Sequence, residues 1–129
     1  MIKYVYCIRK RADLTDEEFH TYWKENHATF ICGLAKALKA KKYIQSHKMD
    51  TPLNDEFVKS RGFDSPAYDG VTELWWDNLD DFLASFSTPE GVEATKQYIA
   101  DESNFVDFSQ SRAFLTEEHV VFDFTSEQA

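Results

Sequence analysis

Histidines are the residues of this sequence whose chemistry is easiest to anticipate. His27 follows Trp23 by four residues and Phe19 by eight, so the three side chains share one face of any helix that spans them. An imidazole ionises near neutral pH and therefore suits general acid or base catalysis. Aromatic neighbours should lower its pKa and keep it neutral. The same position also fits a structural, hydrogen-bonded histidine, so both interpretations remain open.

The other three histidines lie in different patterns. His47 alternates with Tyr43 and Gln45 in a strand-like segment, so these side chains share one face, which is either solvated or one wall of a cleft. His119 follows two glutamates, where a carboxylate either forms an ion pair between subunits or orients the imidazole. His20 is expected on the polar, solvated side of its helix.

The spacings that identify other reactive sites are missing. There is no H-E-x-x-H, no H-x-H and no cluster of cysteine and histidine, so we expect no metal site. There is also no G-x-G-x-x-G, P-loop or G-x-S-x-G motif, which argues against nucleotide cofactors and acyl chemistry. Cys7 and Cys32 are far apart and form no disulfide framework. Acid–base catalysis by histidine in an aromatic-lined pocket is the chemistry that remains.

Composition limits the class of protein and its partners. The 129 residues fit a single domain that is long enough to bury a core, and 16% aromatic residues exclude a disordered chain. A formal net charge of −9 disfavours binding to nucleic acid or to an anionic membrane surface. No signal-peptide pattern and no apolar run of about 18 residues is present, so we expect a cytoplasmic protein.

Capping residues and periodicity predict the order of the elements. Thr15 and Glu18 form a capping box, Asn78 caps a second helix, and that helix restarts at Pro89. Gly33 is expected to end the first helix, and the Ala- and Lys-rich segment 33–42 has room for another helical turn before the next strand. The expected elements are strands at 2–9, 42–49, 68–76 and 112–124, helices at 15–33 and 78–100, and a long connection at 50–67, in one domain at 1–124 followed by a frayed tail at 125–129.

This β-α-β-β-α-β order predicts an α+β, ferredoxin-like fold. Such a fold has a four-stranded antiparallel sheet with both helices on one face. The first, third and last strands carry apolar residues on both faces, so the second face should also be buried. Only a second copy of the chain is available to cover it, which predicts a homodimer with the architecture of a dimeric α+β barrel.

Four segments together resemble the EthD family of the dimeric α+β barrel superfamily. They are YWKENHATF (22–30), YIQSH (43–47), YDGVTELWWDNLDDF (68–82) and SNFVDFSQSRAFLTEEHVV (103–121). The resemblance implies that the chain shares the fold of relatives that include cofactor-free decarboxylases and dehydratases of polyketide pathways. Other members of the superfamily are aromatic cyclases, monooxygenases, muconolactone isomerases or haem-degrading proteins. The histidine most often implicated in relatives ends the first helix and corresponds to His27.

We therefore predict a cofactor-independent enzyme of the lyase or isomerase type. It would decarboxylate, dehydrate or cyclise a small aromatic or polyketide-like substrate in a catabolic or secondary-metabolite pathway. His27 would be the general base or acid, and His47 and Asn104 would orient an oxygen or stabilise developing negative charge. The expected substrate-binding residues are Trp23, Phe30, Tyr43, Trp75 and Phe105.

Two alternatives use the same pocket differently. The chain could be a non-enzymatic accessory or ligand-binding protein that supports an oxygenase. It could also be a haem-binding or monooxygenase-type protein, with His27 or His119 as the axial ligand.

Overall fold

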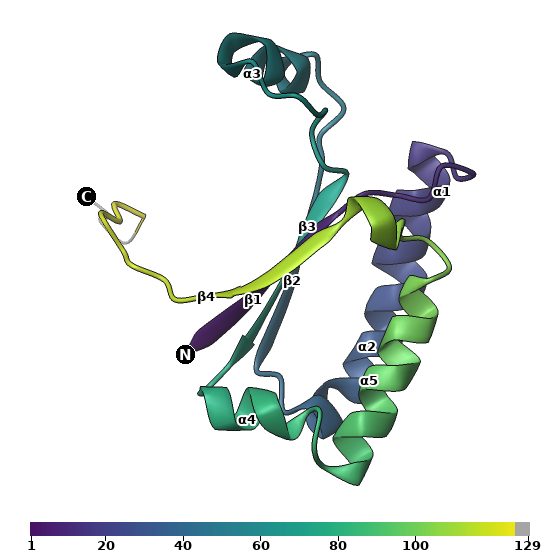
Figure 1. Ribbon diagram of the computed structural model, residues 1–129, viewed down its shortest axis with the longest axis vertical. Coiled ribbons are helices and arrows are strands. Elements are labelled where there is room, and N and C mark those ends of the chain that lie inside the picture. The colour runs from purple at the N-terminus through teal and green to yellow at the C-terminus, as the bar shows by residue number, and fades with distance from the viewer. Residues whose placement is uncertain (126–129) are drawn as a thin grey trace.

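The computed structural model, which describes residues 1–125, is built on one four-stranded sheet with helices packed on one face (Figure 1). The strands follow the order β2-β3-β1-β4, and every neighbouring pair is antiparallel. This arrangement confirms the predicted α+β, ferredoxin-like fold. The strands are β1 (Ile2–Ile8), β2 (Lys42–His47), β3 (Gly70–Trp76) and β4 (Arg112–Thr116), and the helices are α1 (Asp16–Thr21), η1 (Tyr22–His27), α2 (Ala28–Leu38), α3 (Leu53–Arg61), α4 (Leu79–Ala84), α5 (Pro89–Glu102) and η2 (Phe108–Gln110).

Helices begin where the capping residues predicted. The Thr15 hydroxyl accepts a hydrogen bond from the Glu18 amide, and the Glu18 carboxylate accepts one from the Thr15 amide. Asn78 caps α4 through the amide of Asp81, and α5 starts at Pro89 behind the Thr88 cap. These contacts satisfy backbone donors that a helix start otherwise leaves unpaired.

The first helical segment runs without a break from α1 through η1 to the end of α2, so the prediction that Gly33 ends it is wrong. Gly33 is exposed, its backbone is not left-handed, and the chain turns instead at Lys39, whose φ is 59°. The middle turn, η1, is a π-helix, in which the Ala28 amide donates to the Trp23 carbonyl. Trp23 and His27, which both belong to this turn, are buried.

The last strand is shorter than predicted, because β4 ends at Thr116 instead of reaching residue 124. Thr116 pairs with Lys3, close to the start of β1, so later residues have no strand beside them. Residues 117–125, which we call the C-terminal arm, run past the end of the sheet and away from the helices (Figure 1). Val121 on this arm is 90% exposed. The predicted tail, apart from Thr125, lies outside the described residues.

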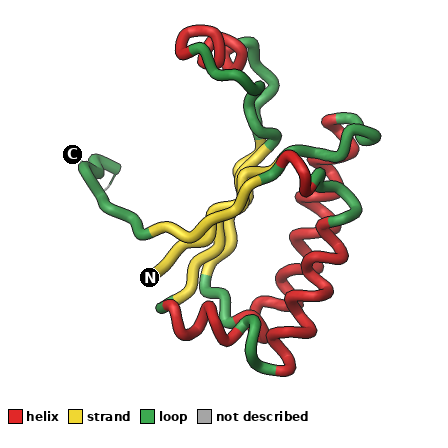
Figure 2. Tube along the Cα trace, in the orientation of Figure 1, coloured by secondary structure: helices red, strands yellow, loops and turns green. Residues whose placement is uncertain are grey.

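Strand alternation gives the sheet two different faces. Tyr4, Tyr6 and Ile8 of β1 point toward the helices, and Tyr6 and Ile8 join a buried cluster with Phe19 of α1 and Phe105. The opposite side, which we call the open face, is not covered by a helix within residues 1–125 (Figure 2). Strand pairing places a mixed set of side chains from all four strands on it. It includes Lys3, Val5, Cys7, Ile44, Val71, Glu73, Trp75 and Phe114.

Residues 48–69, which we call the excursion, connect β2 to β3 and carry α3 at their tip (Figure 1). The Lys48 amide donates to the Asp69 carbonyl at 3.0 Å, so the two ends of the excursion meet. None of the residues of α3 is buried. Within residues 1–125, no helix has both the length and the apolar character needed to cross a membrane.

Candidate active site

A cavity of about 360 Å³ lies between the helix-facing side of the sheet and helices α4 and α5. Its size falls at the lower end of the range of small-molecule sites. Tyr4 and Tyr6 of β1, Trp76 of β3, Phe82 of α4 and Tyr98 of α5 are among the residues that line it. The cavity is therefore walled mainly by aromatic rings, which suits a flat, mostly apolar ligand.

One carboxyl group, that of Glu102, lines this aromatic cavity. Glu102 ends α5 and is only 4% exposed. The Tyr6 hydroxyl donates to its Oε1 at 3.4 Å, while its buried Oε2 has no hydrogen-bond partner among the described residues. Burial raises the pKa of Glu102 to about 8, against the opposing effect of hydrogen bonding with Tyr98 and Tyr6. At neutral pH the group is therefore mainly a neutral acid with a proton to donate.

The tyrosines around Glu102 keep their protons. Burial raises the pKa of Tyr4, Tyr6 and Tyr98 above the usual value, and the neighbouring Glu102 carboxyl raises each of them further. Their hydroxyls therefore remain hydrogen-bond donors over the whole working range of pH. The cavity thus combines apolar walls with a few hydroxyl groups and one acid.

His27 lies on the other side of the same end of α5. Its Nδ1–H donates to Asp101 Oδ2 at 2.6 Å, and Tyr22 donates to the other oxygen of Asp101, also at 2.6 Å. Asn104 Nδ2 donates to the Tyr22 hydroxyl at 3.0 Å. Burial lowers the pKa of His27, and the interaction with Asp101 opposes this. The bond to Asp101 places the neutral imidazole's proton on Nδ1.

The structure thus brings the predicted residues His27, Asn104 and Phe105 together. The rings of His27 and Phe105 lie 4.8 Å apart, and the His27 ring lies 5.6 Å from that of Tyr98, which lines the cavity. His27 itself is 3% exposed, and neither it nor Asn104 is among the described residues that line the cavity. This group therefore braces the last turn of α5 from behind the cavity wall.

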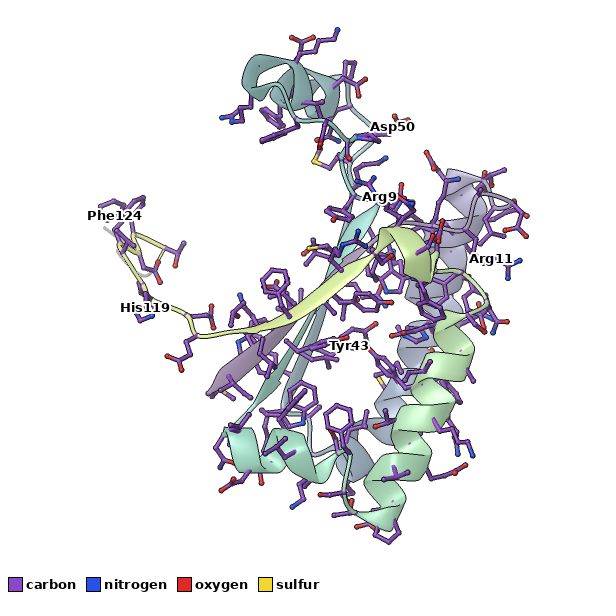
Figure 3. All side chains as sticks on the ribbon, viewed as in Figure 1. Arg9, Arg11, Tyr43, Asp50, His119 and Phe124 are labelled. Atoms are coloured by element: carbon purple, nitrogen blue, oxygen red, sulfur yellow. The ribbon has the colours of Figure 1, made fainter. Side chains whose placement is uncertain are left out.

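His47 belongs to a second polar network, together with the predicted residues Tyr43 and Trp23. Its Nδ1 lies 2.7 Å from Nδ1 of His20, and its Nε2 lies 2.7 Å from Oε1 of Gln45. Gln45 in turn donates to the Tyr43 hydroxyl and to the Trp23 carbonyl. Figure 3 shows Tyr43 pointing from the sheet toward the helices. His20, expected to be solvated, instead links α1 to the end of β2.

The histidine pair should make a contribution to stability that is lost in acid. Burial, with His20 close by, lowers the pKa of His47 to about 4, so the folded chain resists a proton that the unfolded chain takes up below pH 6.5. The contribution of His47 to the free energy of unfolding is therefore fully present above pH 6.5 and decreases toward pH 4. Urea unfolding at pH 7.5 and 5.0 should show that His47→Gln gains stability relative to the parent as the pH is lowered. His119→Gln, on the C-terminal arm, is the matched control, and equal changes in all three proteins would contradict the prediction.

The remaining predicted binding residues lie apart from the cavity. Trp75 is on the open face, where its indole N–H donates to Glu118 and the ammonium groups of Lys3 and Lys42 lie over its ring. Phe30 is 38% exposed on α2. The alternation of side chains along a strand does not show which face of the sheet packs against the helices. The sequence therefore placed Trp75 in the substrate pocket, whereas it lies on the open face.

Sequence reasoning missed Glu102, although a signal was present. Gly91, Ala94, Tyr98 and Glu102 follow one another at spacings of three and four residues, so they share one face of α5. Gly91, Ala94 and Glu102 are buried. The predicted helix ends at residue 100, so Glu102 falls in the connection after it, where an acidic residue is usually solvated.

No metal site is apparent. Among residues 1–125, no group of three or more histidine, cysteine, aspartate or glutamate side chains is arranged to hold a metal ion. Cys7 and Cys32 are both free.

Comparisons with solved structures place the fold among known proteins. An EthD family protein from Bacillus halodurans aligns with a TM-score of 0.59 at 15% identity, covering 92% of this chain and 99% of that chain. A dimeric protein of unknown function and ferredoxin-like fold from Bacteroides fragilis gives 0.55 at 17% identity, covering 91% and 95%. The hydroxynitrile lyase of Passiflora edulis gives 0.51 at 12% identity, covering 92% and 95%. At these identities the likeness shows the fold alone.

The sequence comparisons identify the family. No curated protein sequence matches the chain. The family model of the EthD domain matches residues 11–109, which run from just after β1 into η2 and include strands β2 and β3 and the helices from α1 to α5. Since this match covers most of the sequence, the chain belongs to the EthD family.

Proposed function

We propose that this EthD protein is a cofactor-independent lyase or isomerase that acts on a small aromatic substrate in the cavity. The observation that carries the proposal is the buried carboxyl group of Glu102 in a cavity lined mainly by aromatic and aliphatic side chains, where burial raises its pKa to about 8. Such a group can both give and take a proton near neutral pH.

The proton transfers balance without any added group. In a dehydration, the Glu102 acid protonates a substrate hydroxyl, which leaves as water, and the resulting carboxylate removes a proton from the adjacent carbon. In a keto–enol isomerisation, the same acid protonates the carbonyl oxygen and the carboxylate takes the proton from the neighbouring carbon. In both cases Glu102 is neutral again at the end, and the hydrogen bond from Tyr6 helps to stabilise its charged form between the two transfers.

His27 and Asn104 act in this proposal as positioning residues. Through Asp101 and Tyr22 they hold the end of α5, the turn that carries Glu102. A shift of about 1 Å in a catalytic group is enough to slow a reaction substantially. His47 and Tyr43 hold the neighbouring strand edge against Trp23 through Gln45.

Turnover without cofactors tests the proposal. The protein is dialysed against a chelator and incubated with a panel of small aromatic hydroxy-carbonyl, keto and polyketide-like compounds, and products are followed by mass spectrometry in H₂O and in D₂O. We expect loss of water, or deuterium incorporation beside a carbonyl, with at least one compound. Binding of panel members with neither change would support the accessory-protein alternative instead.

We also propose that the chain works as a homodimer through the open face. Val5, Ile44 and Phe114 lie on this face, with Ile44 37% and Phe114 53% exposed. The C-terminal arm and the excursion both extend beyond the body of the chain, where a second copy would contact them (Figure 3). The ferredoxin-like relatives from Bacteroides fragilis and Thermobifida fusca are described as dimeric.

Light scattering at micromolar concentration should therefore give about twice the mass of one chain. Phe114→Glu should shift the equilibrium toward monomer, because it places a charge within the apolar part of the interface. Val92→Glu changes an exposed apolar residue of α5, away from the open face, and should remain dimeric. A parent protein that is monomeric under these conditions would rule out this assembly.

A further inference from the structure

The polar groups of the cavity share one property, which is that none carries a positive charge. Apart from the Glu102 carboxyl, the polar side chains among the described lining residues carry only hydroxyl groups or the indole N–H of Trp76, and lysine, arginine and histidine are absent from the lining. The cations of the nearby strands lie elsewhere, since Lys3, Lys42 and Arg112 belong to the open face. The cavity is therefore poorly suited to hold an anion.

We infer that the substrate of this cavity is an uncharged aromatic carbonyl compound, a ketone or an aldehyde, and not a carboxylate. This inference rests on the proposed function only in taking the Glu102 cavity as the substrate site. It narrows the possible reactions to dehydration, cyclisation or isomerisation of a neutral molecule, because decarboxylation starts from a carboxylate.

The hydrogen bonds of Glu102 indicate what the ligand must offer. Oε1 accepts from Tyr6, and the Tyr98 hydroxyl also interacts with the carboxyl group. The acidic proton is best placed on Oε2, because no hydrogen bond to this oxygen forms among the described residues. A buried O–H without an acceptor is unfavourable, and a carbonyl oxygen of the ligand would supply one. A ligand carboxylate would also accept this bond, but it would be buried among apolar rings without a cation to compensate its charge.

The groups that face Glu102 do not titrate before it does. Tyr6 and Tyr4 face it from β1, Tyr43 interacts with it from β2, and the pKa of each is raised. On its own helix, the pKa of Tyr98 is also raised, and the charge of Asp101 makes ionisation of Glu102 harder. As pH rises, Glu102 is therefore the first of these groups to change, and with it the cavity loses its acidic donor.

Two naphthalene probes of the same ring size test the inference by isothermal titration calorimetry. 2-Acetonaphthone is a neutral ketone, whereas 2-naphthoate is a carboxylate at every pH used. At pH 6.5 the parent should bind the ketone at least about 10-fold more tightly than the carboxylate. At pH 9.5 ketone binding should weaken by up to about 30-fold, the factor expected for loss of a required proton with a pKa near 8.

Two variants separate the charge of Glu102 from its hydrogen bonds. Glu102→Gln keeps an amide donor at every pH, so its affinity for the ketone should be the same at pH 6.5 and 9.5. Glu90→Gln, an exposed glutamate of the same helix, should behave like the parent. A parent that binds 2-naphthoate as tightly as the ketone, binds the ketone equally at both pH values, or binds neither probe at millimolar concentration would overturn the inference.

The outcomes also distinguish this inference from the proposed function. Selective, pH-dependent binding of the ketone without turnover of any panel compound would keep the substrate class and reject the lyase or isomerase. Conversely, turnover of an aromatic carboxylate that Glu102→Gln abolishes would keep the enzyme and reject the neutral substrate.

Discussion

Glu102→Gln is expected to lower the turnover number by about 10²–10⁴ once a substrate is identified, the usual contribution of a positioned acid–base group. The amide has nearly the same shape as the acid and can accept the hydrogen bond from Tyr6, but it cannot transfer a proton. The rate constant should fall while the affinity for a neutral ligand changes little. Initial rates over a range of substrate concentrations check this, with Glu90→Gln as the control.

The stability of the same variant provides an independent check. The pKa of Glu102 is raised to about 8 in the folded chain, so the contribution of Glu102 to the free energy of unfolding should be lost as pH rises from about 4.5 through 8. Glu102→Gln removes this loss and should unfold at a higher urea concentration than the parent at pH 9. If Glu102→Gln keeps the parental rate, Glu102 is not the acid–base group. If Glu102→Gln is unfolded at pH 6 without urea, the role of Glu102 is structural.

Phe105→Ala is expected to reduce the free energy of unfolding by about 3–5 kcal/mol. Phe105 is completely buried, and its ring packs against those of Phe19, Tyr22 and His27. Truncation would leave a cavity where α1, η1 and the segment after α5 meet, and these helices are too tightly fixed to close it. Urea unfolding of both proteins at pH 7 measures the difference.

Phe57→Ala is the matched control for this prediction. Phe57 lies on α3 and is 52% exposed, so the same truncation should change stability by less than about 1 kcal/mol. Equal effects at the two positions would show that Phe105 is not the centre of the core that the structure indicates.

Local signals predicted where the helices begin, and longer-range geometry determined where elements end. Thr15, Asn78 and Pro89 mark helix starts because a cap involves residues only a few positions apart. The end of β4 depends on the start of β1, since Thr116 reaches Lys3 and the neighbouring strand then stops. The sequence of residues 112–124 alone does not indicate where β1, the strand that β4 pairs with, begins.

The candidate site was only partly predictable for the same reason. The stripe of Phe19, Trp23 and His27 correctly indicated a buried aromatic environment for the imidazole. The hydrogen bond from His27 to Asp101 and the approach of Tyr6 to Glu102 join residues that are 74 and 96 positions apart. Such contacts depend on how α5 packs against η1 and on which face of β1 it covers, and a single sequence leaves both undetermined.

The closed base of the excursion has a practical consequence for engineering the chain. Lys48 and Asp69 are joined by a backbone hydrogen bond and by an ion pair at 3.3 Å. The end of β2 and the start of β3 are therefore close enough to be connected by a tight turn. The entropy lost on closing a loop changes slowly with loop length. A longer insert at the tip of the excursion would therefore change the free energy of unfolding only slightly. None of residues 48–69 is among the described residues that line the cavity. A fluorophore on α3, at the tip of the excursion, would therefore lie outside the lining of the cavity and would report on the approach of the second copy proposed above.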